Sequence, residues 1–477
     1  MTGTDNEAFN DPTAPVTTTD SGSVRGRRRA GVASFLGVPY AAPPVGELRF
    51  AAPTRPQPWD GVGDATAAGP ASVQEQSAGE LVPKVVPATD EDCLTVNVWT
   101  PAVKLDEGLP VIVWLHGGGF AVGSASARCY GGEELARRGA VVVGVNYRLG
   151  ALGYLYLPEE AAVDGIRANF GLLDQMRALE WVRDNVAAFG GDPARVTVVG
   201  QSAGAYSILA LGAMERARPL FHRAVLQSAP FAVDDHDIDV AEDTTSVFLK
   251  AAGIAGGGRA ELLGLSAAQI LRAQQETFDR FTGTGHLDRP FVPVVDGETL
   301  TVKPAQAAFE GSLDSVDLLV GCTAEERLFF PQDGSLSGSG REQARRIGAQ
   351  IDDLFTEGVF RLGEHRALVG RPARLFWWRW PSGGSEGLGA CHCAELPFLF
   401  GDLDQWADSA FLRHGTADDH AYLVDAVQGA WVSFSETGDP DPDGTLGWTP
   451  YTVDGRETLV FDVPVEQTSD PRDGRVR

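Results

Sequence analysis

The sequence predicts an α/β fold in which helices cover both faces of a large, mostly parallel β-sheet. Short apolar and β-branched runs alternate with segments of helical periodicity along the chain, which is typical of this class. Val111–Leu115 and Ala140–Asn146 are apolar almost throughout, as expected of strands that are buried on both faces. The β-branched run Val196–Val199 leads through a Gly-containing turn into a helical segment, so strand and helix are directly coupled there.

The predicted elements follow one another without a linker that would divide the chain. A polar, acidic tail over residues 1–16 is expected to be disordered, and residues 17–477 are expected to form a single domain. Residues 17–80 are rich in Pro and Gly and predict an irregular wrapping segment, whereas residues 240–310 predict a helical insertion beside the sheet. The helices are assigned where apolar residues recur at intervals of three and four. The predicted strands are Ala33–Val38, Leu94–Trp99, Val111–Leu115, Ala140–Asn146, Val196–Val199, Ala224–Gln227, Leu318–Gly321 and Arg374–Trp380, and the predicted helices are Asn169–Ala188, Ala203–Ala213 and Tyr422–Ser435.

Composition and charge exclude several classes of function. The chain has 43% hydrophobic residues and a net charge of −26, so nucleic acid and anionic membrane surfaces would be repelled and are not expected partners. No run of apolar residues is long enough for a membrane span, and residues 1–16 lack the features of a signal peptide. The predicted location is therefore the cytoplasm.

Residues Gly200–Gly204 read Gly-Gln-Ser-Ala-Gly and lie between a predicted strand and a predicted helix. In this context Gly-x-Ser-x-Gly is typical of a nucleophile elbow, a tight turn that holds a serine hydroxyl at the end of a strand. An ordinary Gly-rich turn is the alternative, because a chain with 57 glycines contains such spacings by chance. The strand–turn–helix context favours Ser202 as a nucleophile, with small residues required at positions 200 and 204.

A serine nucleophile also needs hydrogen-bond donors for the oxyanion that forms during acyl transfer. The run His116–Gly119 directly follows the predicted strand Val111–Leu115 and contains three consecutive glycines. Glycines let backbone N–H groups turn inward without hindrance from a Cβ atom. Gly118 and Gly119 are therefore the expected donors, together with the N–H of Ala203 in the elbow.

The general base and the acid that orients it should follow the nucleophile in the order Ser, acid, His. Of the eight histidines, His392 lies in a Gly-containing loop after a late predicted strand, whereas His116 is expected to be structural. Glu325 and Glu326 follow the predicted strand Leu318–Gly321, and the residues alone leave either carboxylate as the acid.

A metal site is not expected. Cys391, His392 and Cys393 are consecutive, which is not the spacing of zinc ligands, and no second ligand cluster lies nearby in the sequence. The chain has five cysteines, too few and odd in number for a disulfide framework.

The chain resembles the type-B carboxylesterase family, which includes bacterial para-nitrobenzyl esterases and the cholinesterases. The resemblance extends from about residue 17 to residue 462 and rests on several motifs in the family's order. Besides the elbow and the glycine run, the matching segments are Phe35–Ala41, Pro44–Phe50, Glu91–Trp99, Asn169–Gln175, Phe189–Pro193, Pro290–Gly297 and Trp448–Tyr451.

The resemblance implies an α/β-hydrolase fold with a gorge-like pocket and no cofactor. It implies Ser202 as nucleophile, Glu326 as acid and His392 as base, and it matches Ser228 to a second serine that supports this triad. The residue before the nucleophile departs from the family, because Gln201 stands where Glu is usual. This substitution removes one negative charge beside the site.

The expected function is hydrolysis of small-molecule carboxylic esters, of small to medium size and apolar character, through an acyl-enzyme. An amidase or carbamate hydrolase would use the same triad and stays an alternative. A non-catalytic interaction protein with a cholinesterase-like fold is a further alternative, although the serine, the glutamate, the histidine and the glycine run are all present. The sequence does not indicate an oligomeric state.

Overall fold

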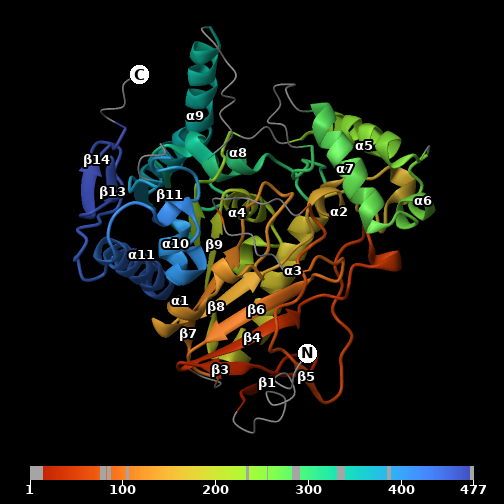
Figure 1. Cartoon of the computed structure of the whole chain (residues 1–477), viewed down its shortest axis with the longest axis horizontal. Helices are drawn as coiled ribbons and strands as arrows, with labels where there is room; N and C mark the ends of the chain where they lie inside the picture. The colour runs from red at the N-terminus through yellow and green to blue at the C-terminus, as the bar shows by residue number, and fades with distance from the viewer. Residues whose placement is uncertain are drawn as a thin grey trace.

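The computed structural model describes residues 14–75, 82, 88–103, 107–232, 236–254, 256–281, 290–329, 339–383 and 388–472, and only the backbone of residues 339–352. Within these ranges an 11-stranded sheet has the order β14-β13-β12-β11-β10-β9-β7-β8-β6-β4-β3 (Figure 1). Its strands are β3 (Arg27–Arg29), β4 (Val32–Pro39), β6 (Thr95–Thr100), β7 (Leu109–Leu115), β8 (Val141–Val145), β9 (Gly191–Gln201), β10 (Arg223–Gln227), β11 (Asp317–Thr323), β12 (Arg374–Trp378), β13 (Glu457–Phe461) and β14 (Glu466–Ser469).

The sheet is parallel in its centre and antiparallel at both margins. Strands β8, β7, β9, β10, β11, β12 and β13 pair in parallel, whereas β3, β4 and β6 at one margin and β14 at the other pair antiparallel. The predicted α/β class with a mostly parallel sheet is therefore confirmed. A separate 3-stranded sheet joins β1 (Val16–Thr18), β2 (Ser23–Arg25) and β5 (Val62–Asp64).

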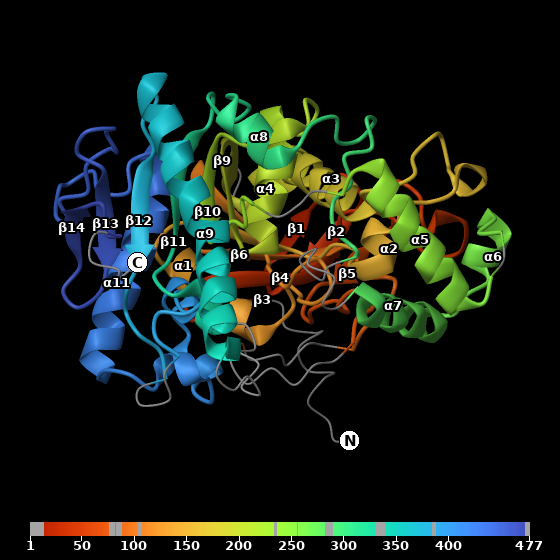
Figure 2. The same cartoon turned by 90° about the horizontal axis from the view of Figure 1, so that it is seen from above.

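Helices lie on both faces of the sheet and in an insertion at one end. In Figures 1 and 2 the helices α5, α6 and α7 gather at the end of the molecule opposite β13 and β14, so the predicted insertion over residues 240–310 is helical. The described helices are α1 (Glu133–Arg137), α2 (Gly150–Tyr154), α3 (Phe170–Asn185), α4 (Ala203–Ala213), α5 (Ile238–Ala252), α6 (Arg259–Leu263), α7 (Ala267–Phe281), α8 (Pro304–Phe309), α9 (Ser339–Leu368), α10 (Leu396–Phe400) and α11 (Ala417–Thr437).

Strand β7 shows why the central strands are apolar throughout. Val111, Val113 and Leu115 belong to a hydrophobic core on one face of the sheet. Ile112 and Trp114 belong to a second core on the other face. Successive side chains of a strand point to opposite faces, so a strand covered on both sides cannot alternate apolar with polar residues.

Several predicted boundaries differ from the structure. Strand β9 begins at Gly191 rather than Val196, because its first residue pairs with Leu109 beyond an irregularity in the register. The predicted helix Asn169–Ala188 ends as α3 at Asn185 and continues as a 3₁₀ turn. Residues 1–13 of the predicted tail lie outside the described residues, and Val16 already begins β1. Among the described residues, no helix has both the length and the apolar character that a membrane span requires.

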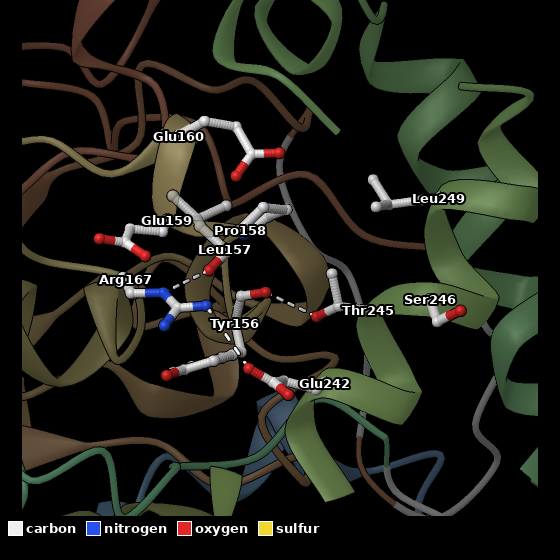
Figure 3. Close-up of a pocket in the computed structure, with 10 residues that line it drawn as sticks. All are labelled: Tyr156, Leu157, Pro158, Glu159, Glu160, Arg167, Glu242, Thr245, Ser246 and Leu249. Atoms are coloured by element: carbon white, nitrogen blue, oxygen red, sulfur yellow. Dashed lines mark hydrogen bonds and ion pairs between the residues drawn. The ribbon is translucent and has the colours of Figure 1, made fainter. Parts of the chain in front are cut away.

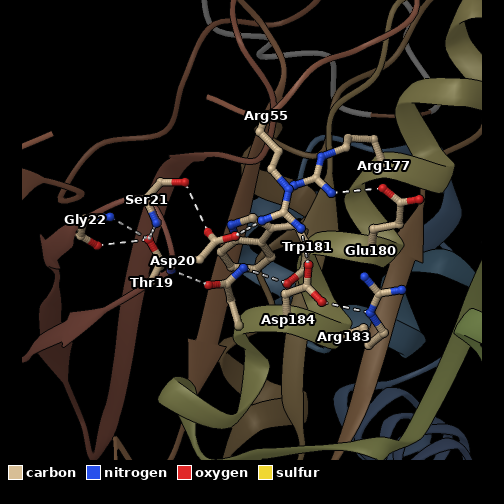
Figure 4. A network of polar contacts seen from close by, with 11 residues as sticks. Thr19, Asp20, Ser21, Gly22, Arg55, Arg177, Glu180, Trp181, Arg183 and Asp184 are labelled. Carbon is tan, nitrogen blue, oxygen red and sulfur yellow. Dashed lines mark hydrogen bonds and ion pairs between the residues drawn. The ribbon is translucent and has the colours of Figure 1, made fainter. Parts of the chain in front are cut away.

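Two kinds of ion pair hold helix α3 in place. Arg148, which follows β8, donates from Nε and Nη2 to the two oxygens of Asp174 on α3, at 2.8 and 2.7 Å. Both side chains are buried, with exposed fractions of 3% and 0%. At the helix surface, Arg55 bridges Asp20 and Asp184 and so joins the N-terminal segment to α3 (Figure 4).

We expect the two aspartates of α3 to differ sharply in their contribution to stability. Asp174→Ala leaves the guanidinium of Arg148 buried without its carboxylate, and should lower the free energy of unfolding by roughly 3–5 kcal/mol. Asp184→Ala removes a solvent-screened pair on the same helix, and should cost about 1 kcal/mol or less. Urea unfolding of both variants measures the difference, and equal losses would contradict the role assigned to the buried pair.

Candidate active site

Ser202 sits in a tight turn between β9 and α4. Its backbone has φ 55° and ψ −123°, a conformation that a non-glycine residue rarely adopts. The turn is held because the Ser202 N–H donates to the carbonyl of Gln227 on β10, at 2.9 Å. The Ser202 carbonyl in turn accepts from the N–H of Tyr206 in the first turn of α4, at 2.9 Å. The predicted strand–turn–helix context of the serine is therefore present.

The two glycines of the motif allow the chain to cross itself closely at this turn. A Cβ atom on Gly200 would lie 2.5 Å from the carbonyl carbon of Gly204. A Cβ atom on Gly204 would overlap the carbonyl oxygen of Leu115, the last residue of β7. Both positions therefore require glycine for steric reasons, in agreement with the small residues expected there.

The glycine run after β7 lies directly against the elbow. A Cβ atom on Gly117 would lie 3.1 Å from the Cβ of Ser202. Gly118 and Gly119 have φ values of 117° and 61°, in the region that favours glycine. Within the described part of the chain, the N–H groups of Gly118, Gly119 and Ala203 donate no hydrogen bond. Three donors of the predicted oxyanion hole thus remain available beside Ser202.

His116, at the start of this run, is a structural residue. Its ring stacks on Tyr147 with 4.4 Å between ring centroids, and its Nδ1 lies 2.8 Å from the carbonyl oxygen of Gly117. Complete burial lowers the pKa of His116 to about 4. The imidazole therefore stays neutral and fixes the loop that it belongs to.

His392 and Glu326 form a buried pair at the carboxyl ends of the next strands. Glu326 follows β11 and begins the 3₁₀ turn Glu326–Phe329, and His392 lies in the loop after β12. The Nδ1 of His392 makes a short hydrogen bond with Oε2 of Glu326. Oε1 of the same carboxylate accepts the N–H of Thr323 at 2.8 Å, so both of its oxygens are engaged.

The imidazole of His392 faces the elbow with its other nitrogen. Its Nε2 lies 3.0 Å from the amide nitrogen of Gln201, the residue before Ser202. The rings of Phe329 and Phe355 pack against the imidazole, with centroids 5.5 and 4.9 Å away. The base candidate is therefore held on one edge by a carboxylate, contacts the residue before Ser202 with the other edge, and packs against two apolar rings.

The structure distinguishes the two glutamates that the residues alone left open. The carboxylate of Glu325 is hydrogen-bonded to the backbone and not to the imidazole of His392: its Oε2 accepts the N–H of Ala390 at 3.1 Å. Its own N–H donates to the carbonyl of Ala390 at 2.9 Å. Glu325 thus anchors the loop that carries His392, whereas Glu326 touches the ring itself.

Ser228 contributes through its backbone. Its N–H donates to the carbonyl of Gly321 at 2.8 Å and so ties the end of β10 to β11, just before Glu326. The Ser228 hydroxyl is buried and makes no hydrogen bond to a described residue. Among the described residues, Ser228 therefore supports the strand end before Glu326 through its backbone N–H, and its side chain makes no contact with the triad by hydrogen bond.

A second buried carboxyl group, which the sequence analysis did not single out, lies near the pair. Glu395 is three residues after His392, and its Oε1 accepts from the side-chain amide of Gln227 at 3.0 Å. The side-chain oxygen Oε1 of Gln227 accepts in turn from the indole N–H of Trp431 at 3.2 Å. Burial, with the nearby Glu326 charge adding to it, raises the pKa of Glu395 to about 8. Glu395 is therefore an uncharged acid at neutral pH and adds no second negative charge near Glu326.

The raised pKa of Glu395 predicts a pH dependence of stability. The folded state holds this proton up to about pH 8, whereas the unfolded chain releases it near the ordinary value of 4.5. Between these values the folded state binds more protons, so stability falls as pH rises, by roughly 1 kcal/mol per pH unit for this group. Glu395→Gln removes this loss, so its unfolding free energy should rise relative to the native chain from pH 5 to pH 8.

Urea unfolding across this pH range tests the expectation, with the exposed Glu160→Gln as the control. A difference between Glu395→Gln and the native chain that does not change with pH would show that Glu395 is ionised in the folded state.

Known proteins match the chain over nearly its whole length. The model of the carboxylesterase family matches residues 13–347. The chain is 36% identical to a phenmedipham hydrolase of Pseudarthrobacter oxydans, covering 94% of this chain and 95% of that protein. It is 35% identical to a para-nitrobenzyl esterase of Bacillus subtilis (strain 168), covering 96% and 97%. A solved structure of a thermophilic PNB esterase superimposes with a TM-score of 0.86 at 34% identity, covering 97% of this chain and 99% of that one.

The family match, the relatives of nearly equal length and the shared architecture agree with the serine elbow and the buried histidine–glutamate pair. This chain therefore belongs to the type-B carboxylesterase family and is an ester-hydrolysing enzyme with the α/β-hydrolase fold.

Proposed function

We propose that the chain hydrolyses carboxylic esters through an acyl-enzyme on Ser202, with His392 as base and Glu326 as the acid that orients it. The observation that carries this proposal is the buried His392–Glu326 pair, whose second imidazole nitrogen reaches the serine elbow at the amide of Gln201, next to three backbone N–H groups that donate no hydrogen bond within the described residues. These are the parts that acyl transfer needs: a nucleophile, a base and an oxyanion site.

In the first half of the reaction, the Ser202 hydroxyl attacks the ester carbonyl and its proton passes to Nε2 of His392. In the resting structure this Nε2 lies against the amide of Gln201, so it has to exchange that contact for the serine hydroxyl. Glu326 keeps the other ring proton on Nδ1 and stabilises the imidazolium that forms. The N–H groups of Gly118, Gly119 and Ala203 hold the oxyanion.

The second half of the reaction releases both products. His392 returns the proton from Nε2 to the leaving alcohol, and the acyl group stays on Ser202. Water then attacks the acyl carbonyl while His392 takes its proton and afterwards gives it back to the Ser202 oxygen. The acid product leaves, and the enzyme is restored without a cofactor.

The surroundings of the base favour apolar esters of small to medium size. Phe329 and Phe355 pack against His392 and form apolar surface next to the expected position of the scissile bond. Gln201 stands where a carboxylate is usual in the family, so no negative charge at that position attracts cationic alcohols.

Hydrolysis of amides or carbamates on the same triad is the second candidate. Two relatives support it by name: the phenmedipham hydrolase, at 36% identity, and a probable N-octanoylanthranilate hydrolase of Rhodococcus erythropolis, at 37% identity over 88% of this chain. The same nucleophile, base and oxyanion site would act, with stronger protonation of a nitrogen leaving group by His392.

Removal of the nucleophile or the base should abolish turnover. Ser202→Ala and His392→Ala should each lower kcat on p-nitrophenyl butyrate by about 10⁴-fold or more, because either change removes the acyl-transfer step. A variant that keeps a tenth of the native rate would contradict the assignment.

The neighbouring glutamates supply a matched control for the acid. Glu326→Gln should lower kcat by about 10³-fold or more, since the amide cannot hold the imidazole in the same tautomer or stabilise its charge. Glu325→Gln keeps an oxygen that accepts the Ala390 N–H and should retain most of the activity. The reverse order of effects would transfer the acid role to Glu325.

Leaving-group and chain-length series separate the two candidate activities. Initial rates on p-nitrophenyl acetate, butyrate and octanoate should be high and should vary with acyl length, because longer acyl groups would make more contact with apolar side chains such as Phe329 and Phe355. Rates on the matching p-nitroanilides should be far lower for an esterase. Turnover of anilides or of phenmedipham at rates comparable with the esters would favour the second candidate, and the Ser202→Ala variant controls for background hydrolysis.

A further inference from the structure

A cleft of about 570 Å³ opens at the antiparallel margin of the main sheet, away from the triad and the glycine loop. Arginines line it from two directions: Arg27 and Arg29 from the edge strand β3, and Arg128 from the 3₁₀ turn Arg128–Tyr130. Trp99 of β6 lines it as well. We call this the arginine cleft.

The register of the strands explains how these side chains come together. Arg27 pairs with Ser34 of β4, and Ser34 pairs with Trp99 of β6, so the three side chains lie in one row on the same face of the sheet. Arg29 is two residues further along β3 and shares that face. The indole therefore forms part of a floor from which two guanidinium groups extend at the sheet edge.

The three arginine side chains of the cleft form no salt bridge with a described residue. Among the residues that the structure describes, the side chains of Arg27, Arg29 and Arg128 have no hydrogen-bond or ion-pair partner. Arg28, which points to the opposite face, donates to the carbonyl of Gly31 at 3.0 Å. Unpaired arginines that converge on one cleft are notable in a chain with a net charge of −26.

A second surface hollow, of about 340 Å³, shows the contrasting case (Figure 3). Its arginine, Arg167, lies over the ring of Tyr156, donates to the carbonyl of Leu157 at 2.7 Å and pairs with Glu242 at 3.7 Å. The charge of that arginine is used within the protein, so the hollow offers no cation to a ligand.

Two carboxylates also line the arginine cleft, and a cation outside its lining balances part of their charge. Glu133 and Asp402 both act on Arg137, whose pKa is raised chiefly by its hydrogen bond with Glu134 and further by these two charges. The cleft therefore keeps an excess of positive charge on the side formed by β3 and Arg128.

Trp99, which lines the same cleft, also carries an uncharged donor without a partner among the described residues. The residue is 4% exposed, and its indole N–H is buried without a hydrogen-bond acceptor among the described residues. A buried donor without a partner costs free energy, and an acceptor on a ligand would recover it.

We propose that the arginine cleft binds a small anion that carries a carboxylate or a phosphate group. Guanidinium groups match the paired oxygens of such anions, and two or three of them around one site supply charge-assisted hydrogen bonds. The remainder of the ligand would lie on the apolar surface that Trp99 and Leu36 contribute to the lining. This site is separate from the proposed ester-hydrolysing site and does not depend on it.

The arginines of β3 have an alternative use, because charged side chains on an edge strand prevent pairing with other molecules. For such edge protection it does not matter to which face of β3 an arginine points, and Arg128, which is not on β3, plays no part in it. The test therefore compares arginines on the two faces of β3.

Titration calorimetry on the full chain, with inorganic phosphate and with benzoate at constant ionic strength, measures binding directly. We expect saturable binding of at least one probe at millimolar concentration. Tighter binding of phosphate would indicate a phosphate ligand, and tighter binding of benzoate would indicate a carboxylate ligand. Arg27→Gln with Arg29→Gln, and separately Arg128→Gln, should weaken binding by about tenfold or more. Arg28→Gln should bind as the native chain does.

Trp99→Phe tests the uncharged donor, since it keeps the ring and removes the N–H. This substitution should weaken anion binding by a few-fold. All of the variants should hydrolyse p-nitrophenyl butyrate at the native rate, and this control would show that they are folded. Absence of saturable binding of both probes, or an equal loss in Arg28→Gln, would overturn the proposal and leave edge protection as the role of the arginines.

Discussion

The contact between Gly204 and the end of β7 is the constraint on which the rest of the site depends. Because no Cβ atom fits between Gly204 and the carbonyl oxygen of Leu115, helix α4 can begin directly beside the last residue of β7. The glycine run that follows β7 is then held against Ser202. Nucleophile and backbone donors are thus brought together by a close approach of main chain, with no side chain at the point of contact.

Burial of charge is the second requirement, and the chain meets it in two ways. Arg148 and Asp174 are buried as a paired, hydrogen-bonded ion pair. Near the triad the carboxylate of Glu326 is paired with His392, while the second acid, Glu395, is kept uncharged by burial.

Most of the main elements followed from the sequence, because they depend on local patterns. The helix Ala203–Ala213 is predicted to the residue, and the strands around it differ by a few residues at their ends. The long helix α9 and the hairpin of β13 and β14 were not predicted. Both lie in the late part of the chain, where motifs that would fix the positions of elements are sparse and periodicity alone gave no clear boundary.

The sequence by itself determined the fold class and predicted the serine elbow and the glycine run, since each rests on residues close together in the chain; the prediction of His392 as base rests on the chain order and on the resemblance to the family. The resemblance to the family already implied Glu326 as the acid, but the residues alone left Glu325 open; in the tertiary structure it is Glu326 that touches the imidazole, because adjacent residues at the end of a strand point in different directions. It also revealed the contact of Gln201 with His392, the neutral Glu395, and the cleft that joins Arg27, Arg29 and Arg128. These features arise where segments distant in sequence meet, and their energies depend on burial, which no local pattern records.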